Sequence, residues 1–410
     1  MAKRKRVLSG MRPTGRLHLG HYFGALSNWL KLQEEYDCFF FVADWHALTT
    51  HYEDTSSIAE NTLQVATDWL SVGIDPAKST LFVQSNILEH AELHVLLSMI
   101  TPLSWLERVP TYKEQIENLT DRDLGTYGFL GYPLLQAADI VIYDADFVPV
   151  GEDQVPHVEL TRETVRRFNA QFGLAISEKL NTRENRKLRL QLNGIVHTGA
   201  FLDSDIMPAY AWNNWTGQLK KIVREIGFEN AVQELPVALR KFYRLQRIVT
   251  EPGHLLTETP RLPGTDGRRM AKSYGNAIWL SDPPDEIRTK VRNMMTDPQR
   301  QRRTDPGRPE VCPVFAWHKL FSSLDTVTQI DHECRTAAIG CVQCKGQMAE
   351  NLVKWIEPVQ SRRKELEARP NEVWDILDAG GKKAQKTARR TMKRVRNAIF
   401  KWDEARNKTA

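Results

Sequence analysis

The chain has 410 residues, and its 56 lysines and arginines exceed its 51 aspartates and glutamates by a net charge of +5. This length allows two or three domains with cores of their own, whereas no apolar run approaches the roughly 20 residues that a membrane helix needs. The basic residues 1–6 are followed by polar residues and a proline instead of the apolar core of a signal peptide, so we expect a soluble, cytoplasmic protein.

The first predicted elements are a strand, a loop and a helix. Residues 7–8 are typical of the end of a short buried strand, and residues 22–32 have helical apolar spacing. The stretch between them is rich in glycine and carries His18 and His21 near the predicted helix start. A helix N-terminus has unpaired N–H groups and a positive dipole end, so this turn suits a phosphate. The alternative is an ordinary glycine-rich turn with surface histidines.

Up to about residue 170, apolar strands alternate with amphipathic helices. Residues 38–43 and 80–84 are continuous apolar runs, residues 58–70 have helical spacing, and residues 147–150 are typical of a short strand. Such a pattern predicts an α/β domain over residues 1–170 with a parallel sheet. Ligands bind beyond the carboxyl ends of parallel strands, and the polar side chains there are Asp44, His46, Glu152, Asp153 and Gln154.

At about residue 171 the pattern changes, and we expect an inserted subdomain over residues 171–250. Residues 187–192 alternate with period two, which predicts a half-exposed strand, and an aromatic stretch at 210–215 precedes two predicted amphipathic helices that end near Leu245. Residues 251–285 then return the chain to the first domain. They contain a glycine-flanked loop with Lys272 between small residues.

The remainder, residues 286–410, is predicted to be a helical domain. The glycine pair at 380–381 is expected to break the helical pattern, and a last helix places apolar residues at steps of three and four over 384–402. The opposite face of this helix is basic, and Arg300, Arg302 and Arg303 form a smaller basic cluster. Both suit the phosphates of a nucleic acid, although a solvated helix face also accounts for such runs.

Four of the five cysteines are grouped with the spacing C-x21-C-x6-C-x2-C, formed by Cys312, Cys334, Cys341 and Cys344. Four thiolates suit either tetrahedral Zn²⁺ or a [4Fe–4S] cluster, and the alternative is four unrelated reduced thiols. Cys38 stands apart in an apolar run and is expected to be a buried small hydrophobe.

The glycine–histidine turn and the lysine loop resemble the two ATP-binding signatures of class I aminoacyl-tRNA synthetases. The segments that carry this resemblance are His18-Leu19-Gly20-His21 and Met270-Ala271-Lys272-Ser273, in this order. It implies a Rossmann-like catalytic domain in which an amino-acid carboxylate attacks the α-phosphate of ATP. That step needs alignment and charge neutralisation instead of a protein nucleophile. Lys272 and Arg12 are the candidate cations for the leaving pyrophosphate, and Mg²⁺ is expected with ATP.

The predicted helix at 132–139 bears on the choice of amino acid. An indole offers one N–H donor and no acceptor, so its partner must be a buried acceptor, and Asp139 fits, with a helix-surface carboxylate as the alternative. Residues 132–139, 147–154 and 157–162 resemble tryptophanyl-tRNA synthetases, and this likeness covers nearly the whole chain except the insertion. It implies a tryptophanyl-adenylate, transfer to the terminal ribose of tRNA(Trp), a homodimer, and an anticodon-reading C-terminal domain.

The same resemblance implies the roles of individual residues. The catalytic residues are His18, His21 and Lys272. The ATP contacts are Arg12, Pro13, Thr14, Gly20, His21, Gly151, Glu152, Asp153, Leu262, Arg269, Met270, Ala271, Lys272 and Ser273. The tryptophan contacts are Asp139, His46, Tyr132, Gln136, Val148, Val150 and Gln154. Arg269 and Ala271 depart from the signature, which most often has Lys and Ser at these positions.

Two other functions stay open. Tyrosyl-tRNA synthetase shares the fold and both loops, and tyrosine also has a donor for Asp139, although the context of residues 151–154 favours tryptophan. The other alternative is an iron–sulfur or zinc RNA-binding paralogue without charging activity. The cysteine spacing, with Gly340 before the third cysteine, resembles an iron–sulfur subgroup of bacterial tryptophanyl-tRNA synthetases. It implies a [4Fe–4S] cluster, with Zn²⁺ second, in a structural or tRNA-positioning role.

Overall fold

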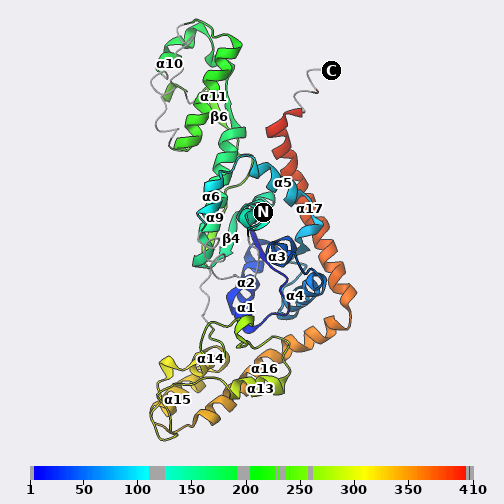
Figure 1. The fold of residues 1–410 in the computed structure, drawn as a ribbon, viewed down its shortest axis with the longest axis vertical. Helices are drawn as coiled ribbons and strands as arrows, with labels where there is room; N and C mark the ends of the chain where they lie inside the picture. Colours follow the sequence, from blue (N-terminus) through cyan, green and yellow to red (C-terminus); the bar gives the residue numbers. More distant parts are fainter. Residues whose placement is uncertain are drawn as a thin grey trace. The chain divides into compact units, whose positions relative to one another are not determined.

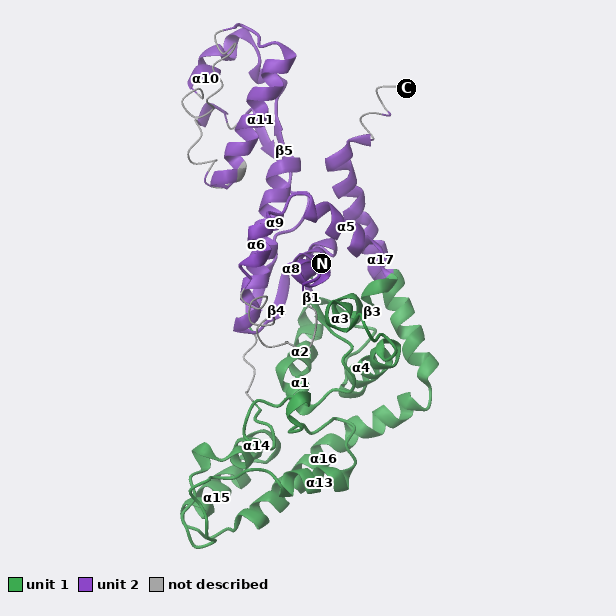
Figure 2. Ribbon diagram, in the orientation of Figure 1, with its two compact units in different colours: residues 1–4, 9–86, 256–382 green, residues 5–8, 87–255, 383–410 purple. Residues whose placement is uncertain are grey.

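The structure is a computed structural model that describes residues 4–109, 125–191, 204–227, 230, 237–239, 241–256, 262–402 and 406. The chain forms two compact units (Figure 2). Unit 1 comprises residues 1–4, 9–86 and 256–382, and unit 2 comprises residues 5–8, 87–255 and 383–410. In the described part of the chain, no helix is both long and apolar enough to cross a membrane.

Unit 1 contains a parallel layer of strands in the order β3-β2-β1. Strand β1 spans Arg6–Met11, β2 spans Asp37–Val42 and β3 spans Ser79–Val83, with Cys38 opposite Ser79 and Val42 opposite Val83. The helical elements of the N-terminal part are α1 (Leu19–His21), the π-helical turn η1 (Tyr22–Leu26), α2 (Ser27–Glu35), α3 (Asp44–His51), α4 (Ile58–Val72) and η2 (Gln84–Asn86). The predicted strands and helices of this region are confirmed, and β1 extends through residues 9–11, which were expected to be loop.

Strand β2 lies in the middle of this core because its side chains are apolar on both faces. Cys38 is fully buried, as expected, and the Phe40 ring stacks on Trp29 of α2 with centroids 4.1 Å apart. On the same strand, Phe41 stacks on Phe82 of β3. Aromatic pairs of this kind add to the stabilisation that burial of their area provides. The sheet therefore holds the loops at its carboxyl edge on a rigid base.

The second part of unit 1 is helical, as predicted. Its elements are η9 (Lys272–Tyr274), α13 (Pro284–Arg292), η10 (Pro309–Val311), α14 (Pro313–Phe321), α15 (Leu324–Arg335), α16 (Cys341–Glu367) and the start of α17 (Pro370–Phe400). Figure 1 shows α13 to α16 gathered in one group of helices. Trp355 of α16 packs edge-on against Tyr22 of η1 at 4.9 Å between centroids, so this group also contacts the N-terminal turn.

Helix α17 runs without a break through Gly380 and Gly381, so the expected interruption is wrong. Gly380 lies so close to β3 that a Cβ atom there would overlap the carbonyl oxygen of Leu81, whereas a Cβ at Gly381 meets nothing within 4 Å. The first glycine therefore serves close helix–strand packing. The predicted apolar face of this helix is confirmed for Ala384, Ala388, Met392 and Val395, which are buried, but Trp402 is exposed.

Unit 2 contains strands in the order β1-β4-β7, with β4 at Phe147–Val150 and β7 at Gly253–Leu256. Strands β1 and β4 are parallel, with Val7 opposite Phe147. The helical elements that follow one another around them are α5 (Glu89–Ser98), α6 (Leu103–Glu107), α8 (Tyr127–Ile142), η3 (Glu152–Gln154), α9 (Val155–Phe168), the π-helical turn η4 (Asn169–Gly173) and the end of α17. Helix α8 packs against both α5 and α9.

The predicted insertion contains some β-structure, but at other positions than expected. Its described elements are β5 (Leu174–Ile176), η5 (Glu178–Leu180), η6 (Arg183–Asn185), α10 (Arg186–Gln191), α11 (Ala209–Ile226), η8 (Val237–Leu239) and β6 (Tyr243–Leu245), with β5 and β6 antiparallel. The strand predicted at 187–192 is wrong, because its described residues form helix α10. The second predicted helix falls mostly outside the described residues, of which Asn230 is helical, and only its expected end near Leu245 is wrong, because β6 lies there. Trp212 and Trp215 of α11 pack in the core of this part.

Candidate functional site

In unit 1, the turn that leads into α1 lies against the segment that follows the lysine loop. The N–H of Leu19 donates to the carbonyl of Ile278 and the N–H of Leu280 donates to that of Leu17, both at 3.0 Å. His18 and Trp279 thereby form an antiparallel bridge between segments far apart in the sequence. The structure brings together the two loops that the sequence analysis expected to converge.

Lys272 lies directly on the N-terminal turn. Its ammonium group donates to the carbonyl oxygen of Thr14 and lies 5.3 Å from the ring centroid of Trp279. Gly15 has a φ of 98°, a conformation that favours glycine, and a Cβ there would lie 3.3 Å from the lysine nitrogen. Partial burial lowers the pKa of Lys272, and Asp68 opposes this effect. The turn therefore holds a cation against its own backbone.

The lysine loop is held by hydrogen bonds of its own. The amide nitrogen of Asn276 donates to Asp266 at 2.7 Å and to the carbonyl of Arg269 at 3.0 Å, and the N–H of Ala271 donates to the Asn276 oxygen at 2.9 Å. The N–H of Gly20 lies 3.3 Å from the sulfur of Met270, which joins this loop to the helix start. Within this frame, Met270 and Leu262 are buried, whereas Arg269 and Ser273 are exposed.

His18 and His21 are neutral at pH 7. Burial, with Lys272 and Arg269 nearby, lowers the pKa of His18 to about 4. Burial and His18, with the same two cations, lower the pKa of His21 to about 3. The rings are tilted by 35° with centroids 3.7 Å apart, and the backbone N–H of His18 donates to His21 Nδ1 at 3.2 Å. They offer hydrogen bonds to a ligand, while the positive charge comes from lysine and arginine.

A buried ion pair fixes the backbone just before these histidines. Asp68 of α4 accepts the N–H of Leu17 at 2.8 Å and pairs with Arg363 of α16. Burial nevertheless raises the pKa of Asp68 to about 6. This contact attaches the C-terminal helices to the turn, a link that the sequence does not indicate.

The remaining predicted site residues of unit 1 lie around this turn and after β2. Arg12 and Thr14 are exposed and Pro13 is buried, while His46 of α3 is half-buried. Asp44, at the start of the same helix, accepts the N–H of Ser85 at 3.0 Å.

In unit 2, one polar face of α8 carries three of the predicted tryptophan contacts. Tyr132, Gln136 and Asp139 recur at steps of four and three, and Tyr143 follows four residues later, so all four share a helix face. His157 of α9 bonds Gln136 Oε1 through Nδ1 at 2.7 Å and lies 3.4 Å from the Tyr132 hydroxyl.

His90 of α5 contacts the other two residues of this face, Asp139 and Tyr143. Its Nδ1 is 2.6 Å from Asp139 Oδ1, and its Nε2 is 2.5 Å from the Tyr143 hydroxyl. Asp139 is 1% exposed, so the alternative of a helix-surface carboxylate is wrong. Sequence analysis did not assign either histidine to this site. His157 begins the segment 157–162 that carries part of the resemblance, which was the available signal, whereas His90 lies on a neighbouring helix outside all of these segments.

The predicted residues after α8 lie on β4 and in the turn that follows. Val148 and Val150 are buried, and Gly151, Glu152 and Asp153 are exposed at the start of η3. Gln154 is half-buried and donates to Asp153 at 3.0 Å.

The four grouped cysteines lie in the helical part of unit 1. Cys312 precedes α14, Cys334 is on α15, and Cys341 and Cys344 are in the first turn of α16. Burial and the other three cysteines raise the pKa of Cys344 to about 12. The four thiols therefore lie near one another, although the described residues include no group of three or more His, Cys, Asp or Glu side chains placed to hold a metal ion.

Two side chains that the sequence analysis did not assign to this cluster contact its sulfur atoms. His318 Nε2 lies 3.5 Å from Cys344 Sγ, and Arg300 Nη1 lies 3.7 Å from Cys334 Sγ. Arg300 is buried and also donates to the carbonyl of Ile339 at 2.7 Å. Its expected role as a surface contact for phosphate is therefore wrong.

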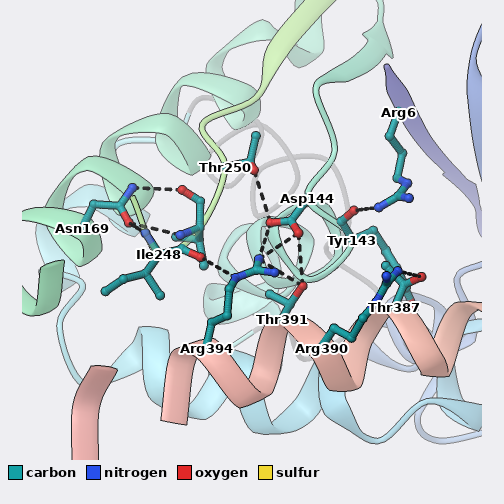
Figure 3. Close-up of polar contacts among 11 residues, drawn as sticks. Arg6, Tyr143, Asp144, Asn169, Ile248, Thr250, Thr387, Arg390, Thr391 and Arg394 are labelled. Atoms are coloured by element: carbon teal, nitrogen blue, oxygen red, sulfur yellow. Dashed lines mark hydrogen bonds and ion pairs between the residues drawn. The ribbon is translucent and has the colours of Figure 1, made fainter. Parts of the chain in front are cut away.

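The basic stretch of α17 is divided between two roles. In unit 2, Nη2 of Arg394 donates to both carboxylate oxygens of Asp144 at 2.6 and 2.7 Å, and its Nε donates to the carbonyl of Ile248 at 3.0 Å (Figure 3). Arg389 pairs with Glu89, and Arg396 pairs with Glu92. These arginines bind the helix to its own unit, whereas the exposed lysines Lys382, Lys383, Lys386 and Lys393 lie on its outer face.

Comparison with known proteins gives consistent matches over the length of the chain. The sequence model of the family "tRNA synthetases class I (W and Y)" matches residues 1–188 and 233–357, which leaves a gap inside the predicted insertion. Tryptophan–tRNA ligase of Ralstonia nicotianae is 48% identical over 406 residues, which are 96% of this chain and 98% of the relative. The tryptophan–tRNA ligase of Thermotoga maritima is 43% identical over 396 residues, with the same shares.

A solved structure agrees with these relatives. Tryptophanyl-tRNA synthetase from Campylobacter jejuni, complexed with ADP and tryptophan, is similar with a TM-score of 0.71 and 27% identity. The match covers 96% of this chain and 99% of that chain.

Proposed function

This chain belongs to the class I tRNA synthetases of the tryptophan and tyrosine type, and from that premise we propose the reaction it performs. It is a tryptophan–tRNA ligase. It activates L-tryptophan with ATP to give tryptophanyl-adenylate and pyrophosphate, and then transfers tryptophan to tRNA(Trp). The observation that carries this proposal is the bridge between His18 and Trp279, which brings Lys272 onto the glycine–histidine turn.

In the activation step, the tryptophan carboxylate attacks the α-phosphorus of ATP, and the bond to the β-phosphate breaks. Lys272 contributes a cation to the departing pyrophosphate, while neutral His18 and His21 donate hydrogen bonds to phosphate oxygens. Mg²⁺, when bound with ATP, neutralises further phosphate charge. Arg12 and Arg269, both exposed at the loops, are available to the same phosphates, and the remaining ATP contacts stay as the resemblance implies them.

Substrate choice is assigned to the polar face of α8. Asp139 accepts the indole N–H, since a buried carboxylate strongly favours a ligand with a donor. Tyr132 and Gln136 lie on the same face of α8, and Val148 and Val150 lie on β4. The resemblance adds His46 and Gln154 to the predicted tryptophan contacts. A ring without a correctly placed N–H does not donate to this carboxylate and binds poorly.

Amino-acid-dependent exchange of pyrophosphate into ATP tests this function. We expect exchange with tryptophan and at least about a hundredfold lower kcat/KM with tyrosine, because the tyrosine hydroxyl lies farther from the amino-acid backbone than the indole N–H, and a buried acceptor strongly disfavours a misplaced donor. Equal or greater exchange with tyrosine makes the chain a tyrosyl-tRNA synthetase. No exchange with either amino acid favours an RNA-binding paralogue.

We also propose that the four cysteines hold a [4Fe–4S] cluster, with Zn²⁺ as the second choice. The support is the chemistry of the donor set: four thiols near one another, two of them in the first turn of α16. Such a group, when bound, supplies a structural cross-link among α14, α15 and α16. A visible absorption spectrum and the iron, sulfide and zinc content of anaerobically purified protein test it, and absence of all three contradicts it.

Three further properties follow from the proposed reaction and stay proposals. The C-terminal helical domain reads the anticodon of tRNA(Trp), with the exposed lysines of α17 available to phosphates. The protein is a homodimer, which sedimentation measures directly. It acts in the cytoplasm, where tRNA and ATP are available.

The domain boundaries at residues 170, 250 and 285 are predictions that limited proteolysis tests.

A further inference from the structure

A chain of buried polar groups runs from α8 to α5 and back. His90 is 0% exposed, Asp139 1% and Tyr143 0%, and the two hydrogen bonds that join them measure 2.6 and 2.5 Å. A buried polar group that loses its partner destabilises the fold, so this connected set holds the Asp139 carboxylate in one orientation.

The carboxylate of Asp139 determines the direction of these hydrogen bonds. Its oxygen accepts, so Nδ1 of His90 carries the ring proton and donates to Asp139 Oδ1. Nε2 of the same tautomer then accepts from the hydroxyl of Tyr143, which keeps its proton because burial, with Asp139 and Glu89 nearby, raises its pKa well above the ordinary value.

We propose that His90 is a positioning residue that determines specificity for the indole N–H, because it fixes the Asp139 carboxylate with one oxygen turned to His90. This inference rests on the proposed role of Asp139 in tryptophan binding. A buried carboxylate that lost this donor would turn toward another partner or take up a proton. In either form it would accept a hydrogen bond from the substrate less well.

The chain contains the same arrangement a second time on the same helix face. His157 lies between Tyr132 and Gln136 as His90 lies between Tyr143 and Asp139, again with Nδ1 toward the acceptor. The recurrence shows that one histidine from each neighbouring helix orients one acceptor of α8. Only the member at His90 faces a carboxylate, so loss of this residue is expected to affect a ligand's donor most.

Comparing tryptophan with an analogue that lacks the indole N–H distinguishes a positioning role of His90 from a purely structural one. The second substrate is the benzothiophene analogue of tryptophan, in which sulfur replaces the indole N–H at nearly unchanged shape. The measured quantity is the ratio of kcat/KM for tryptophan to that for the analogue in pyrophosphate exchange. General damage to the pocket lowers both values and leaves their ratio unchanged.

We expect His90→Leu to lower this ratio roughly tenfold or more, mainly through the KM for tryptophan. His90→Asn, whose amide N–H replaces Nδ1–H, should restore most of it. An unchanged ratio in His90→Leu, or failure of His90→Asn to restore a ratio lost in it, overturns the proposal. If His90→Leu does not fold, Tyr143→Phe replaces it: loss of the hydroxyl frees the tautomer and should lower the ratio several-fold, whereas an unchanged ratio overturns the proposal.

Asp139→Ala separates failure of this inference from failure of the proposed function. If this variant loses the preference for tryptophan while His90→Leu keeps it, Asp139 recognises the indole without help from His90. If Asp139→Ala keeps the preference, the role of Asp139 itself is wrong, and the positioning role of His90 is overturned with it.

Discussion

At the scale of single residues, Lys272 carries the largest share of the proposed chemistry, because its ammonium group lies on the turn that meets the phosphates. We expect Lys272→Ala to lower kcat for tryptophan-dependent pyrophosphate exchange about 10²–10³-fold. The KM for tryptophan should change less than about threefold, since the cation acts on charge that develops in the transition state.

The control for this variant is Lys78→Ala in the same unit. Lys78 is exposed and pairs only at the surface with Glu34, at 2.7 Å, so its loss should leave exchange unchanged. Near-normal kcat in Lys272→Ala would remove the lysine loop from the reaction.

His18 makes stability depend on pH. The pKa of His18 is about 4 in the folded chain against an ordinary 6.5, so the unfolded chain binds more protons between these values. The free energy of unfolding therefore falls as pH drops from 6.5 toward 4 and is fully present above 6.5, with at most about 3 kcal/mol from this residue.

Urea unfolding at pH 7 and pH 4.5 measures this effect. His18→Gln should lose less stability on acidification than the original chain, while His332→Gln, at an exposed position, should lose as much as the original. The same loss in His18→Gln as in the original chain would contradict a neutral buried His18.

At the scale of elements, Gly380 and Gly381 form a matched pair inside α17. Gly380→Ala should destabilise unit 1 by about 2 kcal/mol or more, because its methyl group overlaps the backbone of Leu81. Gly381→Ala should stabilise by about 0.5–1 kcal/mol, since its methyl group meets nothing and alanine favours the helix. Chemical unfolding measures both, and equal effects of the two would contradict the close helix–strand packing.

The sequence predicted the strands and helices of the first domain because their burial pattern is regular. Residues 38–43 are apolar throughout, and the strand is where that pattern places it. The error at 187–192 has a physical cause: Arg189 is fully buried and donates to the carbonyls of Leu180, Thr182, Ser204 and Asp205. Because arginine counts as a polar residue in the sequence pattern, residues 187–192 alternate between polar and apolar types. This alternation is also typical of a half-exposed strand, and it led to the wrong prediction.

At the scale of the whole molecule, the two ATP signatures could be recognised in the sequence because each is a contiguous motif. The residues that support the two predicted sites were not predicted. Asp68 and Arg363, from α4 and α16, hold the glycine–histidine turn, and His90 contacts Asp139 of the proposed tryptophan site from another helix. Such pairs depend on tertiary contacts that leave no local pattern, and so only the structure reveals them.

The cysteine cluster is remote in sequence from the ATP loops, which leads to a test on the complete reaction. We expect Cys341→Ser to lower the rate of tRNA charging at least about tenfold while pyrophosphate exchange stays within about twofold. The reason is that metal loss loosens α14, α15 and the first turn of α16, whereas Arg363, farther along α16, still pairs with Asp68 below the ATP loops. Leu324→Ala, at an exposed position of the same domain, is the control and should change neither rate; equal loss of exchange and charging in Cys341→Ser contradicts the proposed role.

The most direct measurement of the central claim is aminoacylation of purified tRNA(Trp) and tRNA(Tyr) transcripts with labelled tryptophan or tyrosine and ATP. The account predicts that tryptophan is esterified to tRNA(Trp) alone, and that Lys272→Ala slows formation of the adenylate that precedes it. Charging of tRNA(Tyr) with tyrosine, or no charging of either transcript by active protein, would contradict it.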